Sequence, residues 1–474
     1  MGAPTEPGVS PDEASLLKRL VSFVLLVVAL TAGAAAQDSE ARIRELEKKV
    51  EELQHRLDRL ASTADELTRA QIEELRRQID VLTREIENLK SAAPEKAPPS
   101  GVRGAFGLGP AASKIYGVTR GVSIGGYGEV LYQNFDRRRD DGAPSDRADS
   151  IDLARAVFYF GYKFDDRFLF NSEIEYEHAS TGEGAEDKGE VSVEFAYLDY
   201  LIRRGVNLRA GLVLLPLGFV NELHEPPVFL GARRPEVEER ILPTTWRELG
   251  VGVFGDAGPF AYRAYLVDGL DAAGFSGSDP LVEGRQGGSN ARAEDFAVTG
   301  RLDFVGVPGL LIGASGYTGD SAQGRRSPGG RFDARVSLLD AHAEWRWRGV
   351  QVRALAVRGT IGDAAEVNAL DHLSGAESVP KRFTGKYVEA GYDVLFPRGG
   401  RASLVPFARW ERFDTQEAVP AGYAADPGND VRLWTFGLQY RPIPQVVVKL
   451  DYQDVRNEAR TGVDQWNLAL GWLF

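Results

Sequence analysis

The residue-by-residue alternation of apolar and polar side chains constrains this chain most, and the last eleven residues, 464–474, show it clearly. Trp466, Leu468, Leu470, Trp472 and Phe474 share one face at a period of two, and small or polar residues occupy the other. This is the period of a β-strand with one apolar face. A soluble sandwich must bury such a face, whereas a membrane barrel turns it toward lipid.

The same alternation recurs in sixteen segments between residue 120 and the C-terminus. The predicted strands are 120–133, 151–164, 166–178, 190–203, 206–216, 246–256, 258–268, 292–304, 309–319, 333–347, 350–361, 384–397, 402–414, 430–442, 444–457 and 464–474. Seven short turns and eight long loops alternate strictly between them. A soluble sandwich gives no reason to sort its loops in this way. We therefore predict an all-β transmembrane barrel of sixteen antiparallel strands over 119–474, preceded by an α-helical coiled coil.

The charged face of these strands is predicted to line the lumen. In 333–347, for example, Leu339, Trp345 and Trp347 oppose Asp340 and Glu344. An Arg or Lys facing lipid costs about 2–4 kcal/mol at mid-bilayer, and the lumen of a barrel this wide is expected to hold water. The basic residues expected there are Arg155, Lys163, Arg209, Arg263, Arg301, Arg346, Arg353, Arg409 and Lys449. Against these nine bases stand twelve acids, so the predicted lumen has both signs of charge.

Composition excludes several other classes of protein. The mean hydropathy of −0.25 does not fit a bundle of membrane helices, although it fits a barrel whose strands alternate. The chain has no cysteine, which removes disulfides and thiolate chemistry. The net charge of −13 argues against nucleic acid as a partner.

The N-terminus reads as an export signal over 1–36. Lys18 and Arg19 precede the apolar run 20–30, and small residues ending at Ala36 form an A-x-A cleavage site. The run is too short to span a bilayer as a helix. We expect cleavage after Ala36, which places the mature protein outside the cytoplasm.

A heptad repeat follows in 37–90, with apolar residues spaced alternately by three and four between Ile43 and Leu89. The pattern predicts a periplasmic coiled coil roughly 70 Å long, so the chain should oligomerise. β-Branched residues with leucine favour two strands, whereas porins are usually trimers, and we expect a homotrimer. Residues 91–118, rich in Ala, Pro and Gly, are predicted to be a linker.

The stretch 206–222, VNLRAGLVLLPLGFVNE, resembles the phosphate-selective porin O/P family. The matching positions are Arg209, Gly211, Pro216 and Gly218, where the chain leaves a strand for the third long loop. The resemblance implies a trimeric sixteen-stranded diffusion pore whose third loop folds inward to narrow it. Phosphate-selective members line the pore with an excess of Arg and Lys, and the mixed charges predicted here depart from that pattern.

The third long loop, 217–245, is therefore the predicted constriction. The candidate constriction residues are Arg209, Glu222, Arg233, Arg234, Arg240, Arg263, Arg301, Arg346 and Arg353. We expect the bases of the loop to face the passage and its acids to bind the opposite wall, with Arg209 as the wall partner of the loop. Glu222, His224 and Glu225 could suggest a metal site, but one cluster does not define ligand geometry and no metal or cofactor is expected.

The predicted function is passive diffusion of small hydrophilic solutes or ions, with anions such as phosphate as candidates, across a bacterial outer membrane. No catalytic motif is present, so an enzyme is not expected. The alternative is a structural protein whose barrel contacts membrane lipid and whose coiled coil binds peptidoglycan, linking membrane to cell wall. Under a third hypothesis, a soluble enzyme, the protein would fractionate with the periplasm.

Overall fold

The computed structural model of the protein describes residues 104–180, 189–327 and 329–474. The predicted signal peptide, the predicted coiled coil and the first part of the predicted linker lie outside these residues. Within the described ranges, no helix is both long enough and apolar enough to cross a bilayer.

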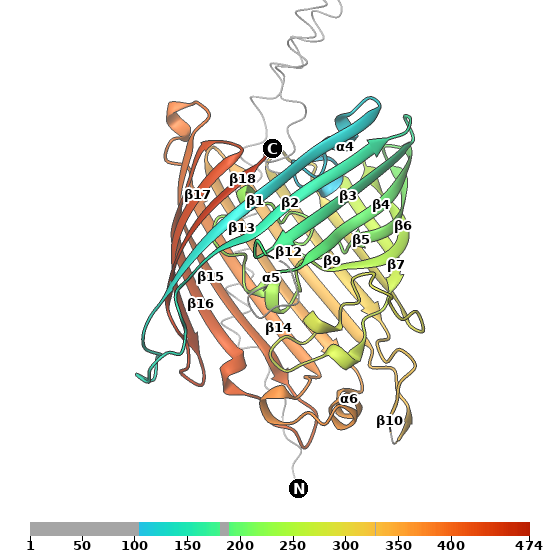
Figure 1. Ribbon diagram of the computed structural model, residues 1–474, viewed down its shortest axis with the longest axis vertical. Helices are drawn as coiled ribbons and strands as arrows, with labels where there is room; N and C mark the ends of the chain where they lie inside the picture. The colour runs from blue at the N-terminus through green and yellow to red at the C-terminus, as the bar shows by residue number, and fades with distance from the viewer. Residues whose placement is uncertain (1–103, 181–188, 328) are drawn as a thin grey trace, which may run out of the picture. The chain divides into compact units, whose positions relative to one another are not determined.

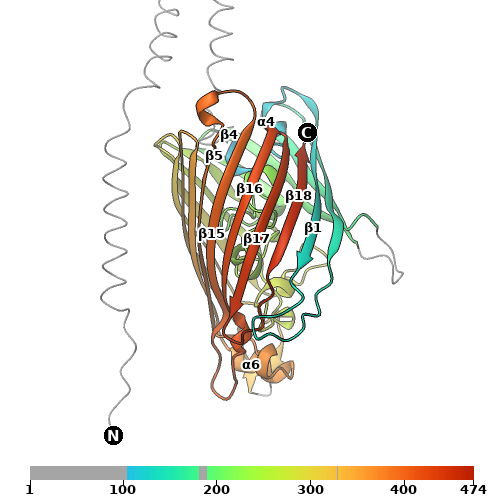
Figure 2. The same cartoon turned by 90° about the vertical axis from the view of Figure 1, so that its left-hand side faces the viewer.

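Sixteen antiparallel strands form one closed barrel in which β1 pairs with β18 (Figures 1 and 2). The barrel strands are β1 Gly121–Phe135, β2 Ser150–Lys163, β3 Phe168–Glu177, β4 Val191–Arg203, β5 Val206–Leu214, β6 Arg247–Ala257, β7 Phe260–Asp268, β8 Phe296–Phe304, β9 Leu310–Gly319, β12 Val336–Trp347, β13 Val350–Ile361, β14 Arg382–Tyr392, β15 Ser403–Ala418, β16 Asp430–Ile443, β17 Val446–Asn457 and β18 Gln465–Leu473. Each strand pairs with its neighbours along the chain, which confirms the predicted strand number and order.

The connections carry the remaining elements. They are η3 (Ala272–Gly274), η4 (Val282–Gly284), the hairpin of β10 (Arg326–Ser327) and β11 (Gly330–Arg331), α6 (Ala364–Leu370), η5 (Gly375–Glu377), η6 (Phe396–Arg398) and η7 (Pro427–Asn429). The β14–β15 turn is longer than predicted, because β14 ends at Tyr392 rather than 397. There the carboxylate of Asp393 accepts hydrogen bonds from the backbone N–H groups of Leu395 and Leu404, each at 3.0 Å, and so closes a wider turn.

An apolar belt covers the outer face of the barrel, as the alternation predicted. In β18, Trp466, Leu468 and Leu470 are exposed, whereas Gln465 and Asn467 are buried. Other exposed apolar residues of the belt include Phe158, Phe160, Leu198, Leu208, Val251, Leu266, Val298, Leu302, Ile312, Val388, Phe436 and Leu450. Exposed apolar surface on this scale requires lipid or another apolar partner.

Leu468 lies at the middle of β18 and provides a direct test of lipid contact. Replacing Leu468 with Arg should destabilise the folded barrel in phospholipid vesicles by about 2–4 kcal/mol, because a guanidinium would face hydrocarbon. Urea titration measures the loss. Ala424→Arg, in the exposed β15–β16 connection, is the matched control and should change stability by less than about 0.5 kcal/mol. Equal effects of the two substitutions would contradict a lipid-facing belt.

The barrel interior is filled on one side by the β5–β6 connection, residues 215–246, named here the inward loop. It contains η2 (Pro226–Val228) and α5 (Val237–Arg240), and α5 is seen behind the front strands in Figure 1. All residues from Leu212 to Ala232 are buried. This burial confirms the expectation that the third long loop folds into the lumen.

A second segment, which the sequence did not predict, also enters the barrel. Residues 104–120, named here the pre-barrel segment, contain η1 (Ala105–Gly107) and α4 (Lys114–Gly117), with Leu108, Ala111, Ala112 and Ile115 buried. The predicted linker thus ends in packed structure from residue 104 on. Its small residues permit this close packing: a Cβ atom on Gly109 would lie 2.3 Å from an oxygen of Glu225.

Candidate pore constriction

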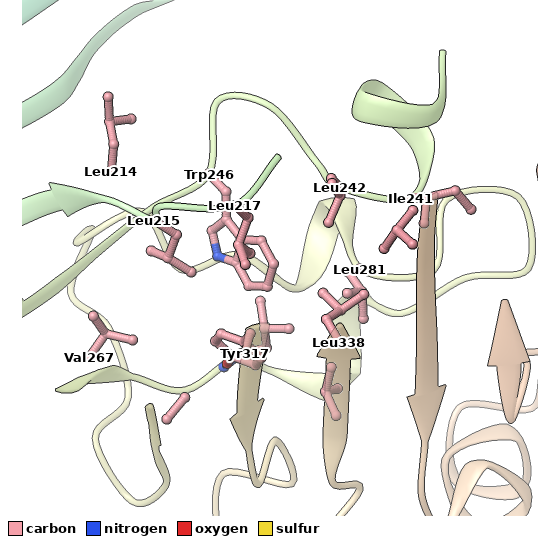
Figure 3. Close-up of a cluster of buried hydrophobic side chains, with 14 of the residues drawn as sticks. Leu214, Leu215, Leu217, Ile241, Leu242, Trp246, Val267, Leu281, Tyr317 and Leu338 are labelled. Atoms are coloured by element: carbon pink, nitrogen blue, oxygen red, sulfur yellow. The ribbon is translucent and has the colours of Figure 1, made fainter. Parts of the chain in front are cut away.

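The inward loop is closed at its neck by hydrogen bonds and an apolar contact. The N–H of Leu215 donates to the carbonyl of Trp246 at 3.0 Å, and the amide of Asn221 bonds to both of these residues. The Trp246 ring packs on Tyr317 of β9, with centroids 4.8 Å apart. Figure 3 shows this cluster, in which leucines from both ends of the loop lie around the indole. The neck therefore directs the loop into the lumen.

The turn that follows the neck is held by one buried carboxyl group. Glu238 accepts hydrogen bonds from the N–H groups of Phe219 and Val220, both at 2.7 Å, and from the hydroxyl of Tyr387 on β14, at 2.6 Å. Burial raises the pKa of Glu238. Gly218 has a positive φ of 59°, and a Cβ there would lie 2.5 Å from Glu238. This explains the glycine of the P-x-G motif.

Cations of the barrel wall bind the backbone carbonyls of the inward loop. The guanidinium of Arg353 donates to Val228 at 3.4 Å, and Lys449 donates to Gly231 at 2.8 Å. Arg409 contacts the carbonyls of residues 233 and 234, and Arg301 donates to Gly218. Because these side chains are buried, Arg301 and Arg353 fix the loop to the wall.

Two further candidate constriction residues, Arg263 and Arg346, also form ion pairs. Arg263 forms an ion pair with Glu222 of the inward loop at 3.1 Å and donates to the carbonyl of Phe106 at 2.8 Å. Arg346 pairs with Glu344 at 2.6 Å. Arg346 and Arg353 share the lining of a narrow cavity of about 10 Å³, roughly the space of one water molecule.

Arg209 binds the pre-barrel segment, so the prediction that it is the wall partner of the inward loop is wrong. Its guanidinium pairs with Asp199 at 2.8 Å and donates to the hydroxyl of Tyr116 at 2.8 Å. The same hydroxyl donates to Asp199 at 2.6 Å. This contact could not be predicted, because Tyr116 lies in a stretch with the composition of a linker.

The inward loop and the pre-barrel segment also bind each other. The carboxyl group of Glu225 accepts hydrogen bonds from the N–H groups of Ala111 at 3.0 Å and Ala112 at 3.1 Å. Burial raises the pKa of Glu225 to about 7. Asn171 of β3 donates to the carbonyl of Ala112 at 2.9 Å. Together these contacts hold the segment against the wall at the short-turn end of the barrel.

The cluster that could have suggested a metal site has other partners. Glu222 pairs with Arg263, His224 contacts Glu173 at 3.0 Å, and Glu225 caps the pre-barrel segment. In the described ranges, no group of three or more His, Asp or Glu side chains could hold a metal ion.

An open cavity of about 600 Å³ lies on the long-loop side. It lies between the inward loop and strands β15 to β18 and β1. The charged residues that line it are Arg139, Asp146 and Arg147 from the β1–β2 connection and Arg233, Glu236 and Arg240 from the inward loop. Four arginines thus face two carboxylates. Arg234 is buried beside the cavity, where it donates to the hydroxyl of Thr244 at 3.2 Å.

The two arginines of the inward loop that line the cavity are positioned by acids. Arg233 pairs with Glu236 at 2.9 Å and with Glu239 at 3.1 Å, and Arg240 pairs with Asp279 at 2.9 Å. Glu236 raises the pKa of Arg233, although burial opposes it. Both side chains are more than a quarter exposed, at 30% and 39%, so their remaining donors face the cavity.

The opposite wall of the cavity carries an apolar patch, which we had not predicted for a lumen. Phe413, Val431, Leu433 and Val455 line it, and the register places Phe413 beside Val431 and Leu433 beside Val455. Farther along β16, on the same face as Val431 and Leu433, the residues are polar, as at Thr435. The signal was present in the sequence: Val431 and Leu433 oppose the lipid-facing Trp434 at a period of two.

Comparison with known proteins identifies one close relative. An uncharacterised protein of Aquifex aeolicus (strain VF5) is 40% identical over 375 residues, which make up 78% of this chain and 83% of that protein. No protein-family model matches the chain, so the resemblance to the phosphate-selective porin O/P family stays a prediction.

The chain is also similar to solved structures of outer-membrane channels. OmpF of Salmonella typhi, in complex with daunomycin, has a TM-score of 0.47 at 11% identity and covers 75% of this chain and 98% of its own. An anion-selective porin of Comamonas acidovorans has a TM-score of 0.47 at 10% identity, over 74% and 99%. The channel DcaP of Acinetobacter baumannii has a TM-score of 0.44 at 12% identity, over 74% and 97%. Identities this low concern the fold alone.

Proposed function

We propose that this chain, which belongs to the same family as the uncharacterised Aquifex aeolicus protein, is an outer-membrane channel for passive diffusion of small hydrophilic solutes, with a preference for anions. The observation that carries the proposal is the cavity of about 600 Å³ inside a closed barrel, lined by four arginines and two carboxylates. Water and small solutes fit such a space.

The outer belt supports a location in a membrane. Exposed leucine, valine and aromatic side chains lie on neighbouring strands. In a membrane they contact lipid instead of water, and this transfer is favourable by about 25 cal/mol per Å² of apolar surface. Closure between β1 and β18 leaves no unpaired strand edge in the barrel. An N-terminal export signal, predicted from the sequence, is consistent with the bacterial outer membrane.

The charge of the cavity supports the preference for anions. Rings or clusters of one sign of charge attract counter-ions into a narrow space and repel ions of the same sign. Within the described residues, Arg147 has no ion-pair partner and lies over the ring of Phe135, 5.5 Å from its centroid. Its charge is therefore available to a solute.

Planar-bilayer recording of the purified full-length protein tests the proposal. We expect stepwise, ohmic channels whose reversal potential in a KCl gradient shows more permeation by chloride than by potassium. Folded protein without conductance would overturn the diffusion function, and a reversal potential of potassium sign would overturn the anion preference.

Arg233 and Arg240 should set this preference. Replacing both with Ala leaves two arginines against two carboxylates in the cavity, so the chloride-to-potassium permeability ratio should fall by roughly twofold to tenfold. The reversal potential measures the change. Arg335→Ala is the matched control, because Arg335 is exposed outside the cavity and pairs with Asp320. A reversal potential unchanged in the double variant would show that these arginines do not lie on the ion path.

The expected homotrimer stays a prediction, which chemical cross-linking of intact membranes would test. The alternative function as a tether to peptidoglycan depends on residues 37–90, outside the described part of the chain. Deleting 38–90 tests it separately, since a tether predicts loss of envelope attachment while channel activity survives.

A further inference from the structure

The cavity combines two surfaces that a simple ion path does not require. One wall carries an apolar patch of Phe413, Val431, Leu433 and Val455, named here the apolar wall. The other carries Arg233 and Arg240. Hydrated inorganic ions gain nothing from apolar side chains, and an apolar wall disfavours water in the lumen. The arrangement therefore indicates a solute with an apolar part.

We propose that this cavity binds small organic monocarboxylates whose body is a ring or a branched alkyl group. The inference rests on the proposed function, in that it places the cavity on the solute path, and it names the class of anion. The apolar body would lie on Val431 and Val455, which are half-buried and face the cavity. The carboxylate would accept hydrogen bonds from the guanidinium groups across from them.

The size of the cavity agrees with this class. A volume of about 600 Å³ lies within the range of roughly 300–1,000 Å³ found for small-molecule sites. Polar residues share the lining with the apolar ones, among them the amide side chains of Gln453, Asn457 and Gln465. They offer hydrogen bonds to ring substituents and to water around the carboxylate.

Binding should be measured directly, so that the result does not depend on conductance. The probe is 4-fluorobenzoate, followed by fluorine NMR line broadening with the full-length protein in detergent micelles and with empty micelles as the blank. Benzoate should displace the probe. Acetate, which keeps the charge, and benzamide, which keeps the ring, should each displace it about tenfold less effectively, because each lacks one of the two contacts.

The double variant Val431→Thr, Val455→Thr tests the apolar wall. Threonine keeps the β-branched shape that suits a strand and adds a hydroxyl group to the surface of the cavity. We expect about fivefold weaker binding of 4-fluorobenzoate. Val448→Thr is the matched control, since Val448 lies on the same strand as Val455 but is exposed on the outer face.

A second variant keeps the test valid if the first does not fold. Arg233→Gln with Arg240→Gln changes two loop side chains that are partly exposed, and it should weaken binding of benzoate but not of benzamide. Inorganic phosphate that displaces the probe as well as benzoate does, or full binding by the folded threonine variant, would overturn the inference. A conducting, chloride-preferring channel without benzoate binding would overturn this inference alone, whereas benzoate binding by a non-conducting barrel would overturn only the diffusion function.

Discussion

Deleting residues 104–118 is expected to raise the single-channel conductance by about twofold or more, because a barrel of this strand number is wide unless something fills it. The pre-barrel segment contacts β3 through Asn171, the inward loop through Glu225, and β7 through Arg263. Its Phe106 ring packs on Phe254 of β6, with centroids 5.0 Å apart. The segment therefore occupies the lumen at the short-turn end, where α4 is seen at the top of Figure 1.

The deletion leaves the buried ion pair between Arg209 and Asp199, at 2.8 Å, in place. The barrel should therefore still fold, which heat-modifiable mobility in electrophoresis checks. Tyr116→Phe is the matched control: it removes one hydroxyl group and keeps the segment, so it should change the conductance little. If the folded deletion variant conducts like the unmodified protein, the segment does not obstruct the ion path.

The sequence was sufficient for the barrel because its signal is local. The lipid-facing positions of β18 and β16 repeat at a period of two, and each strand pairs with its sequence neighbours, so no long-range information is needed. The inward position of the third long loop was also expected, through the resemblance at Pro216 and Gly218. The turn there requires the glycine, since Gly218 has a positive φ and a carboxyl group against it.

The interior could not be predicted because its contacts join residues far apart in the chain. Arg409 binds carbonyls of the inward loop 175 and 176 residues away, and a lumenal arginine looks the same in sequence whether it binds a backbone carbonyl or faces water. The pre-barrel segment was missed for a related reason. Ala and Gly are common in linkers, and they also allow close packing, as at Gly109 against Glu225.

The sequence also could not show which arginines of the inward loop line the cavity. Arg233, Arg234 and Arg240 lie within eight positions of one another, and no local pattern distinguishes them. In the structure, Arg233 and Arg240, the last residue of α5, line the cavity and pair with acids, whereas Arg234 is buried and donates to Thr244. The orientation of each side chain follows from the path of the loop, which its neck and its wall contacts determine.

Glu238 should be the residue on which that path depends most. Its carboxyl group serves two backbone N–H groups of the inward loop and the Tyr387 hydroxyl of the wall. Replacing Glu238 with Ala leaves three buried donors without this acceptor, at about 1–3 kcal/mol each. We therefore expect a loss of about 3 kcal/mol or more in the free energy of unfolding of the loop region, cleavage of the loop by added protease, and noisy channels of higher conductance.

Tyr387→Phe separates the two parts of this contact. It removes only the bond between wall and loop and leaves the bonds from Glu238 to Phe219 and Val220 in place, so it should cost about 1 kcal/mol and leave the loop resistant to protease. Equal damage from both substitutions would mean that the wall bond, rather than the turn of the loop itself, holds the constriction. A Glu238→Ala variant with unchanged protease resistance and unchanged current would contradict the proposed role of this carboxyl group, because the neck and the other wall contacts would then be sufficient to hold the loop.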